Sequence, residues 1–157
     1  MFSISSPAFA HQAPMPRRYT AEGENLSPPL EWSGAPAGAK SVALIMDDPD
    51  APDPRAPQRT YVHWVLYDLP VGAKALPAGA SSSGLPPGTR QGLNDEDRAQ
   101  YSGPAPPVGR HRYFIKLYAL DTTLPELEHP TKARLEAAMN GHVLASTELV
   151  GTYEKSS

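Results

Sequence analysis

Three acidic residues and a run of prolines follow directly on an apolar segment, and this corner is the first place where the sequence could do chemistry. The run Val42–Met46 is typical of a buried strand, yet it stops against Asp47, Asp48 and Asp50. Prolines occupy four of the nine positions from 49 to 57. Because acids are costly to bury and proline cannot pair inside a sheet, the corner predicts a rigid acidic site at a strand end.

Two histidines are expected to join this corner. The link over residues 52–60 is short, which favours antiparallel pairing of the strands on either side of it. In that pairing the end of one strand lies beside the start of the next, so Asp48 and His63 become neighbours. If the strand that follows His111 runs parallel to the one that contains His63, His111 reaches the same end of the sheet. The loop 102–109 would then lie over all three side chains.

A carboxylate beside two imidazoles suits a ligand that offers both hydrogen-bond donors and acceptors. A phosphate monoanion fits, because its P–OH can donate to Asp48 while its oxygens accept from His63, His111 and the Gly103 N–H. A phosphoethanolamine headgroup also fits, since its ammonium satisfies an acid. The predicted function is a binding module for a small anionic or zwitterionic ligand, whose output is interaction with another protein.

Other interpretations of the same residues stay open. Asp48 and His63, with His111, could serve an acid/base enzyme such as a cyclase, lyase or hydrolase. Two histidines and one carboxylate also form the non-haem iron triad. A Ser-His-Asp hydrolase needs a positioned serine, and Ser102 lies in a proline-rich loop. Taken alone, the acidic corner also fits an ordinary turn, and each histidine also fits a residue that only supports the fold.

Composition limits the classes of protein to consider. A length of 157 residues predicts one domain over residues 1–157. The net charge of −3 gives no basic patch for nucleic acid, and no apolar stretch approaches the length of a membrane-spanning helix. There is no cysteine, so no disulfide or thiolate metal site is expected, and no cofactor or metal is predicted. The cytoplasm is the expected compartment, with the periplasm left open.

The predicted elements are mainly strands. Apolar, aromatic and β-branched patterns indicate strands at Ser41–Met46, Tyr61–Leu69, Arg112–Leu120 and, more weakly, Leu149–Tyr153. The segment Thr131–Asn140 is predicted as a helix, with Thr131 as its cap and Gly141 as its end. Proline and glycine make residues 73–92 and 102–109 predicted loops. The expected fold is mainly β, with helices near the C-terminus.

Several motifs together resemble the phosphatidylethanolamine-binding protein family, in its bacterial, Raf-kinase-inhibitor-like branch. They are "SPAF", "RRYTAEGENLSPPLEW", "ALIMDDPDAP", "YVHWVLYDLP", "YSGPAPPVGRHRYFIKLYAL" and "GHVLASTELVGTYEK". The resemblance implies a two-sheet β-rich fold with short C-terminal helices and one small anion pocket at an end of the large sheet. It implies that the pocket is formed by Asp48, Asp50, Pro52, His63, Gly103, Pro104, His111 and Tyr113. Arg112 is implied as a structural partner of one aspartate.

The resemblance carries further expectations, and the sequence also departs from the family pattern. The family implies a cis bond at Ala51–Pro52, a second at Arg59–Thr60, and a homodimer. Ala21 and Ala105 stand where cysteine is common in the bacterial pattern. The loop after Asn94 reads "DEDRAQ", where the family often has Phe-Gly. Its residues Glu96 and Asp97 predict a more acidic pocket mouth.

Overall fold

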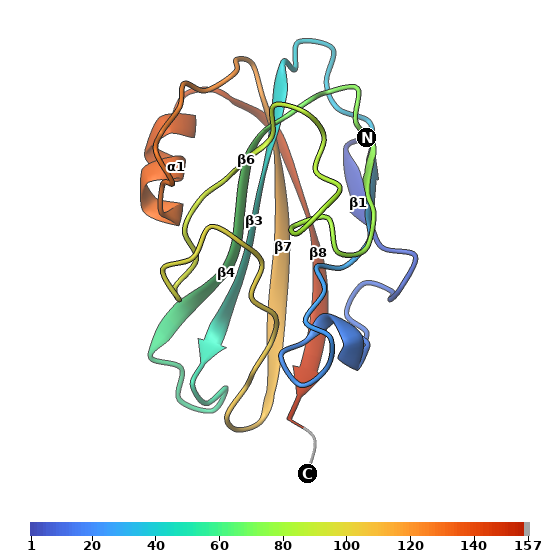
Figure 1. The fold of residues 1–157 in the computed structure, drawn as a ribbon, viewed down its shortest axis with the longest axis vertical. Helices are drawn as coiled ribbons and strands as arrows, with labels where there is room; N and C mark the ends of the chain where they lie inside the picture. Colours follow the sequence, from blue (N-terminus) through green and yellow to red (C-terminus); the bar gives the residue numbers. More distant parts are fainter. Residues whose placement is uncertain (156–157) are drawn as a thin grey trace.

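The larger layer of the protein is a five-stranded sheet. The structure is a computed structural model that describes residues 1–155 (Figure 1). In spatial order the sheet consists of β6 (Arg90–Gln91), β4 (Arg59–Leu69), β3 (Ser41–Ala51), β7 (Arg110–Leu120) and β8 (Val143–Glu154).

The central strand β3 sets the directions of its neighbours. It pairs antiparallel with β4 on one side and with β7 on the other, so β4 and β7 run parallel to each other. Asp48 lies near the end of β3, whereas His63 and His111 lie near the starts of β4 and β7. The three residues therefore come to the same end of the sheet, as the pairing argument predicts.

A second, smaller sheet completes the mainly β fold. It consists of β1 (Ser3–Ser5), β2 (Leu30–Ser33) and β5 (Ala75–Leu76), all antiparallel, and lies to one side of the large sheet (Figure 1). A short 3-10 helix, η1 (Arg17–Tyr19), precedes β2, and α1 (Lys132–Met139) precedes β8. The prediction of a two-sheet β-rich fold is confirmed. The expected C-terminal helices amount, within residues 1–155, to the single α-helix α1.

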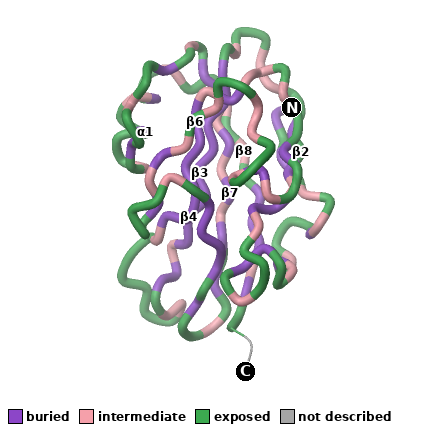
Figure 2. The backbone as a smooth tube through the Cα atoms, in the orientation of Figure 1, coloured by how far each residue is buried: buried purple, intermediate pink, exposed green. Residues whose placement is uncertain are grey.

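Side chains alternate between the two faces of the large sheet. From β3, Leu44 and Met46 pack into one buried cluster together with Trp32 of the small sheet. Ala43 and Ile45 point to the opposite face, because successive side chains of a strand alternate. Both clusters are buried through the middle of the sheet (Figure 2).

The helix α1 covers the face opposite the small sheet. Leu135 and Met139 join the cluster of Ala43 and Ile45. Thr131 accepts a hydrogen bond from the Arg134 N–H at 3.3 Å, which caps the helix as expected. Within residues 1–155, no helix combines the length and apolar character needed to cross a lipid bilayer.

The structure corrects several predicted boundaries. The strand predicted to stop at Met46 continues to Ala51, because the acidic end still pairs with β4. The strand predicted to begin at Leu149 begins at Val143. The predicted loop over residues 73–92 contains β5 and β6, and no strand was predicted for β1 or β2. Pieces of two to four residues are too short to show a period in sequence.

Candidate functional site

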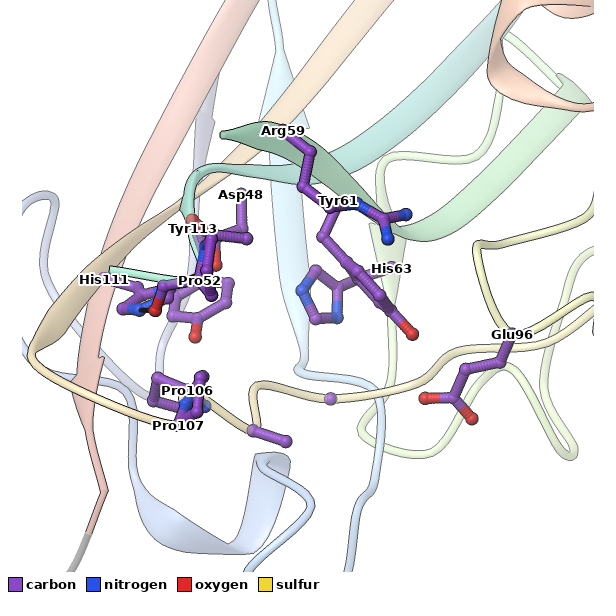
Figure 3. Close-up of a pocket in the computed structure, with 13 residues that line it drawn as sticks. Asp48, Pro52, Arg59, Tyr61, His63, Glu96, Pro106, Pro107, His111 and Tyr113 are labelled. Atoms are coloured by element: carbon purple, nitrogen blue, oxygen red, sulfur yellow. Dashed lines mark hydrogen bonds and ion pairs between the residues drawn. The ribbon is translucent and has the colours of Figure 1, made fainter. Parts of the chain in front are cut away.

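A cleft of about 310 Å³ lies at the end of the large sheet where β3 ends and β4 and β7 begin (Figure 3). This volume is at the small end of the range for small-molecule sites, about 300–1,000 Å³. The residues that line the cleft are Asp48, Ala51, Pro52, Arg59, Tyr61, His63, Glu96, Gly103, Ala105, Pro106, Pro107, His111 and Tyr113.

Most of the predicted site residues line this one cleft. Asp48, Pro52, His63, Gly103, His111 and Tyr113 do so. The structure places Asp50 and Pro104 outside its lining. The carbonyl of buried Pro104 accepts a hydrogen bond from the Ala21 N–H at 2.9 Å, so this residue anchors the loop.

Asp48 and His111 form a buried pair at the base of the cleft. Asp48 Oδ2 lies 2.5 Å from His111 Nδ1, which is a close hydrogen bond. His111 Nε2 donates to the carbonyl oxygens of Pro52 and Val108, each at 3.0 Å. Carbonyl oxygens only accept, so this nitrogen must carry its hydrogen. Both ring nitrogens of His111 are therefore engaged within the protein, unlike the expectation that His111 donates to an anion.

His63 presents a hydrogen-bond acceptor to the cleft. Its side chain is buried, and Nδ1 lies 2.7 Å from the carbonyl oxygen of Ser102, to which it donates. Burial lowers the pKa of His63, and the Ser102 carbonyl and the charge of Asp48 only partly oppose this. The neutral ring then carries its lone pair on Nε2. Within residues 1–155 that nitrogen has no hydrogen-bond partner.

Tyr113 contributes a hydroxyl between the two histidines. Its ring centroid lies 5.3 Å from that of His63 and 6.2 Å from that of His111. The side chain is 1% exposed, and among the described residues its hydroxyl makes no hydrogen bond. Burial strongly raises the pKa of Tyr113, so the phenol stays neutral and can donate to a ligand.

Irregular strand pairing determines which side chains face the cleft. Met46 pairs with Trp64 and Asp47 with Val62, so His63 is an extra residue in a β-bulge. The bulge lets His63 and Trp64 point to the same face. Trp64 joins the core below the cleft, while His63 lies in the cleft itself.

A second irregularity turns Asp50 away from Asp48. The register shifts between Asp48 and Ala51, and the Asp50 carboxylate meets Arg112 instead. Asp50 accepts from the Arg112 N–H at 2.9 Å, from Nε at 3.0 Å and from Nη2 at 2.9 Å. The hydrogen bonds of the Arg112 side chain lower the pKa of Asp50. Arg112 therefore has the partner role that the resemblance implies, and Asp50 supports the cleft from outside.

Gly103 lines the cleft with its backbone but donates its hydrogen bond elsewhere. Its N–H donates to Asn25 Oδ1 at 2.7 Å. A Cβ atom at this position would lie 2.6 Å from both Asn25 Oδ1 and the carbonyl oxygen of Tyr19, so the close approach requires glycine. The N–H that was expected to bind an anion is thus already satisfied.

The sequence did not single out Arg59 and Tyr61 as site residues. Tyr61 pairs with Asp48 across β3 and β4, which puts the two side chains on one face. The Arg59 guanidinium lies 5.0 Å from the Tyr61 ring centroid and 3.3 Å from Asp95. The signal was available in the sequence, since Tyr61 and His63 are two apart on one strand and must share a face. Glu96 was expected near the mouth, and it lines the cleft, whereas Asp97 does not.

The structure also bears on the metal-site and serine-hydrolase interpretations of the sequence. Within residues 1–155 no group of three or more His, Cys, Asp or Glu side chains is placed to hold a metal ion. Ser102 contacts His63 through its backbone carbonyl, which is not the hydroxyl–imidazole contact of a hydrolase.

The Ala51–Pro52 bond is cis, and it is the one cis bond among the described residues, so the expectation for Arg59–Thr60 is wrong.

Comparison with known proteins agrees with this fold. The family model for phosphatidylethanolamine-binding protein matches residues 5–154. A UPF0098 protein of Methanothermobacter thermautotrophicus is 44% identical over 98% of this chain and 99% of its own length.

Two solved structures are similar over nearly their whole length. A putative phosphatidylethanolamine-binding protein homolog from Chlamydia trachomatis superimposes with a TM-score of 0.90 at 39% identity, covering 99% of this chain and 98% of that one. E. coli YbcL, described as a new member of the mammalian family, gives 0.89 at 31% identity and 99% coverage of both chains. This chain therefore belongs to the phosphatidylethanolamine-binding protein family.

Proposed function

We propose that this protein is a small-ligand-binding module whose cleft takes a phosphate monoanion or a phosphoethanolamine headgroup, and whose occupancy modulates a protein partner. One observation carries the proposal. Within residues 1–155, His63 Nε2 and the hydroxyl of Tyr113 have no hydrogen-bond partner, and both lie beside the Asp48–His111 pair in one cleft. A small-molecule site typically offers a few convergent polar groups in a cleft, and groups that the protein does not use itself are available to a ligand.

The free groups match the hydrogen-bonding pattern of a phosphomonoester. Its P–OH can donate to His63 Nε2 or to a remaining lone pair of Asp48. Its other oxygens can accept from the Tyr113 hydroxyl. Asp48 Oδ2 is already hydrogen-bonded to His111 Nδ1, so the carboxylate at the base of the cleft has a partner of its own.

Calorimetric titration with a phosphomonoester tests this proposal. The second pKa of such an ester is about 6, so the ligand loses its P–OH as the pH rises through about 6 to 8. We expect the affinity to fall over this range, because a dianion can no longer donate to His63 or Asp48. Tyr113→Phe, which removes one donated hydrogen bond, should weaken binding by about threefold to tenfold.

Tyr118→Phe is the matched control for Tyr113→Phe. Tyr118 lies on the same strand but packs against the cluster on the opposite face of the sheet. It should bind the ester as the unmodified protein does. Absence of anion binding between about pH 5.5 and 8, or binding that strengthens as the pH rises, would contradict the proposal.

One observation favours an acid/base enzyme as the second candidate. His63 has its tautomer fixed by the Ser102 carbonyl and a free Nε2 in a cleft, which is the arrangement of a general base. A turnover test separates the two functions. A binding module returns its ligand unchanged, whereas an enzyme loses activity with Asp48→Ala or His63→Ala while it keeps its fold.

A further inference from the structure

The three asparagines of the chain differ in the residue that follows them. Asn25 precedes a leucine, Asn94 an aspartate and Asn140 a glycine. The backbone nitrogen of the residue after an asparagine can attack the carbon of the side-chain amide and close a ring. A following glycine hinders this attack least, because it has no side chain and its backbone turns freely. The pair at residues 140 and 141 forms the turn between α1 and β8.

The attacking nitrogen is held in a hydrogen bond at two of the three places. The Leu26 N–H donates to the carbonyl oxygen of Arg18 at 3.1 Å, and the Asp95 N–H donates to that of Val62 at 2.9 Å. Within residues 1–155 the N–H of Gly141 makes no hydrogen bond. A bonded amide must lose its partner before its nitrogen can turn toward a side chain. The asparagine before Gly141 is therefore the one whose neighbour is free to react.

The side chains of the three asparagines differ in the same way. Asn25 Oδ1 accepts from the Gly103 N–H at 2.7 Å. Asn94 is buried, and its Oδ1 accepts from the Glu96 N–H at 2.9 Å. Asn140 is exposed, and its side chain makes no hydrogen bond within the described part of the chain. The two asparagines near the cleft thus use their amides to hold the fold, whereas that of Asn140 remains available.

The backbone around Asn140 has room to change conformation. Gly141 has a φ of 84°, and a Cβ atom there would meet nothing within 4 Å. Ring closure requires rotation about the Cα–C bond of Asn140, whose ψ is 126°. This rotation breaks the turn hydrogen bond from the His142 N–H to the Met139 carbonyl oxygen, which is 2.9 Å long. The turn lies at the surface, so water can replace that bond.

We propose that Asn140 is a site of spontaneous modification, at which the folded protein is converted to aspartate and isoaspartate through a cyclic imide. The Gly141 nitrogen attacks Asn140 Cγ and loses its proton, and the side-chain nitrogen leaves as ammonia. Water then opens the imide. Opening at Cγ gives aspartate, whereas opening at the main-chain carbonyl carbon gives isoaspartate, in which the main chain runs through Cβ and Cγ.

The products change the charge and the chain length at the end of α1. Both carry a carboxylate at the C-terminal end of the helix, where the helix dipole disfavours negative charge. Glu136, four residues earlier, lines the same surface hollow as Asn140, so the two carboxylates repel each other. Isoaspartate also adds one methylene to the main-chain link to β8. The modified protein is therefore distinguishable from the unmodified protein by its charge and by its fragments.

The experiment incubates a dilute solution of the full chain for several days in mildly alkaline buffer. Anion-exchange chromatography should show an acidic form that accumulates with time, and Asn140→Asp, which adds one negative charge to the net charge of −3, marks the elution of the aspartate product. Peptide mass spectrometry should find NH replaced by O at residue 140, at a level at least about tenfold that at Asn25 or Asn94. Electron-transfer fragmentation should identify isoaspartate. Absence of the acidic form, or its assignment to Asn25 or Asn94, overturns the proposal.

Asp95→Gly is the matched control, because it creates a second asparagine–glycine pair at a protected place. The N–H of residue 95 still has the Val62 carbonyl as its acceptor, and Asn94 is 3% exposed. We expect residue 94 to stay unmodified in the folded variant and to react as fast as residue 140 in urea. Leu26→Gly makes the same test at Asn25. If the new pairs react as fast as residue 140 in the folded proteins, the explanation by hydrogen bonding is wrong.

Discussion

At the scale of single residues, His63 shows how burial and one hydrogen bond decide the chemistry of a side chain. A surface histidine changes charge near pH 6.5, but His63 lies against Tyr61, Tyr113 and the backbone of Ser102. Burial penalises the imidazolium, so the ring stays neutral at lower pH than usual. The side chain thereby acts as an acceptor, where the sequence suggested a donor.

This shift predicts how stability depends on pH. Below about 6.5 the unfolded chain takes up a proton at residue 63 before the folded protein does, so the free energy of unfolding falls as the pH is lowered. The contribution of one such group is at most about 1.4 kcal/mol per pH unit. His63→Asn, which keeps a donor for the Ser102 carbonyl, should lose less stability between about pH 7 and 5 in urea unfolding.

His129→Asn serves as the control for this experiment. His129 is exposed and has a positive φ of 56°, which asparagine accepts. The free energy of unfolding of His129→Asn should change with pH as that of the unmodified protein does, across the same pH range. A pH dependence of His63→Asn that equals that of the unmodified protein would contradict the neutral, buried His63.

At the scale of elements, the acidic end of β3 carries three carboxylates that point in different directions and bind different partners. Asp47 points to the face of α1 and binds Lys132 at 2.7 Å and Lys116 at 3.1 Å. Asp48 points into the cleft, and the register shift beyond it sends Asp50 to Arg112. Each acid is buried with partners of its own, and these partners offset part of the cost of burying three carboxylates at a strand end.

Removing Arg112 should weaken this end of the strand. Arg112→Met leaves the buried Asp50 carboxylate without its side-chain donors, and we expect a loss of about 1–2 kcal/mol in the free energy of unfolding. The value is kept small because the arginine itself is half exposed. Arg112→Lys keeps the charge but not the two-pronged geometry, so its free energy of unfolding should lie between those of Arg112→Met and the unmodified protein.

The pH dependence of this loss in the free energy of unfolding tests whether the Asp50–Arg112 ion pair causes it. The pKa of Asp50 is lowered from 3.8 in the folded protein, so its contribution is present above that value and is lost as the pH falls through the folded pKa. The difference between Arg112→Met and the unmodified protein should therefore narrow under strongly acidic conditions. A difference that grows as the solution is acidified would contradict the ion-pair explanation.

At the scale of the whole molecule, the cleft occupies one end of the large sheet. The helix α1 covers the face opposite the small sheet (Figure 1). β8 is an edge strand of the large sheet. Residues 12–15 pair with its last residues, through Val150 and Thr152. At its beginning, Val143 and Leu144 are each 44% exposed, which is unusual for large apolar side chains on an edge.

We expect the protein to form a homodimer that buries the beginning of β8. Light scattering should give twice the chain mass of 16.9 kDa, with dissociation on dilution. Leu144→Lys should shift the mass toward one chain, because a charged side chain on an edge disfavours pairing. Val108→Lys, at another exposed apolar residue, is the control and should leave the mass unchanged. The mass of one chain over a wide concentration range would contradict the dimer.

The sequence by itself determined the strands that carry the site and the end of the sheet at which they meet. Apolar runs before Asp48 and after His111 identify long strands, and a short link favours antiparallel pairing, which makes Asp48 and His63 neighbours. The arrival of His111 depended on its strand running parallel to β4, which the pairing of both strands with β3 provides. The helix was equally predictable, because its cap at Thr131 and its end at Gly141 are local signals.

Only the tertiary structure decided which polar groups remain free for a ligand. Gly103 gives its N–H to Asn25, 78 residues away, and His111 gives its own to two loop carbonyls. Register irregularities reverse the face of Asp50, since a shift of one residue moves a side chain to the other side of a sheet. Sequence periodicity carries no information about such shifts or about partners far along the chain, because both are fixed by packing of the whole fold.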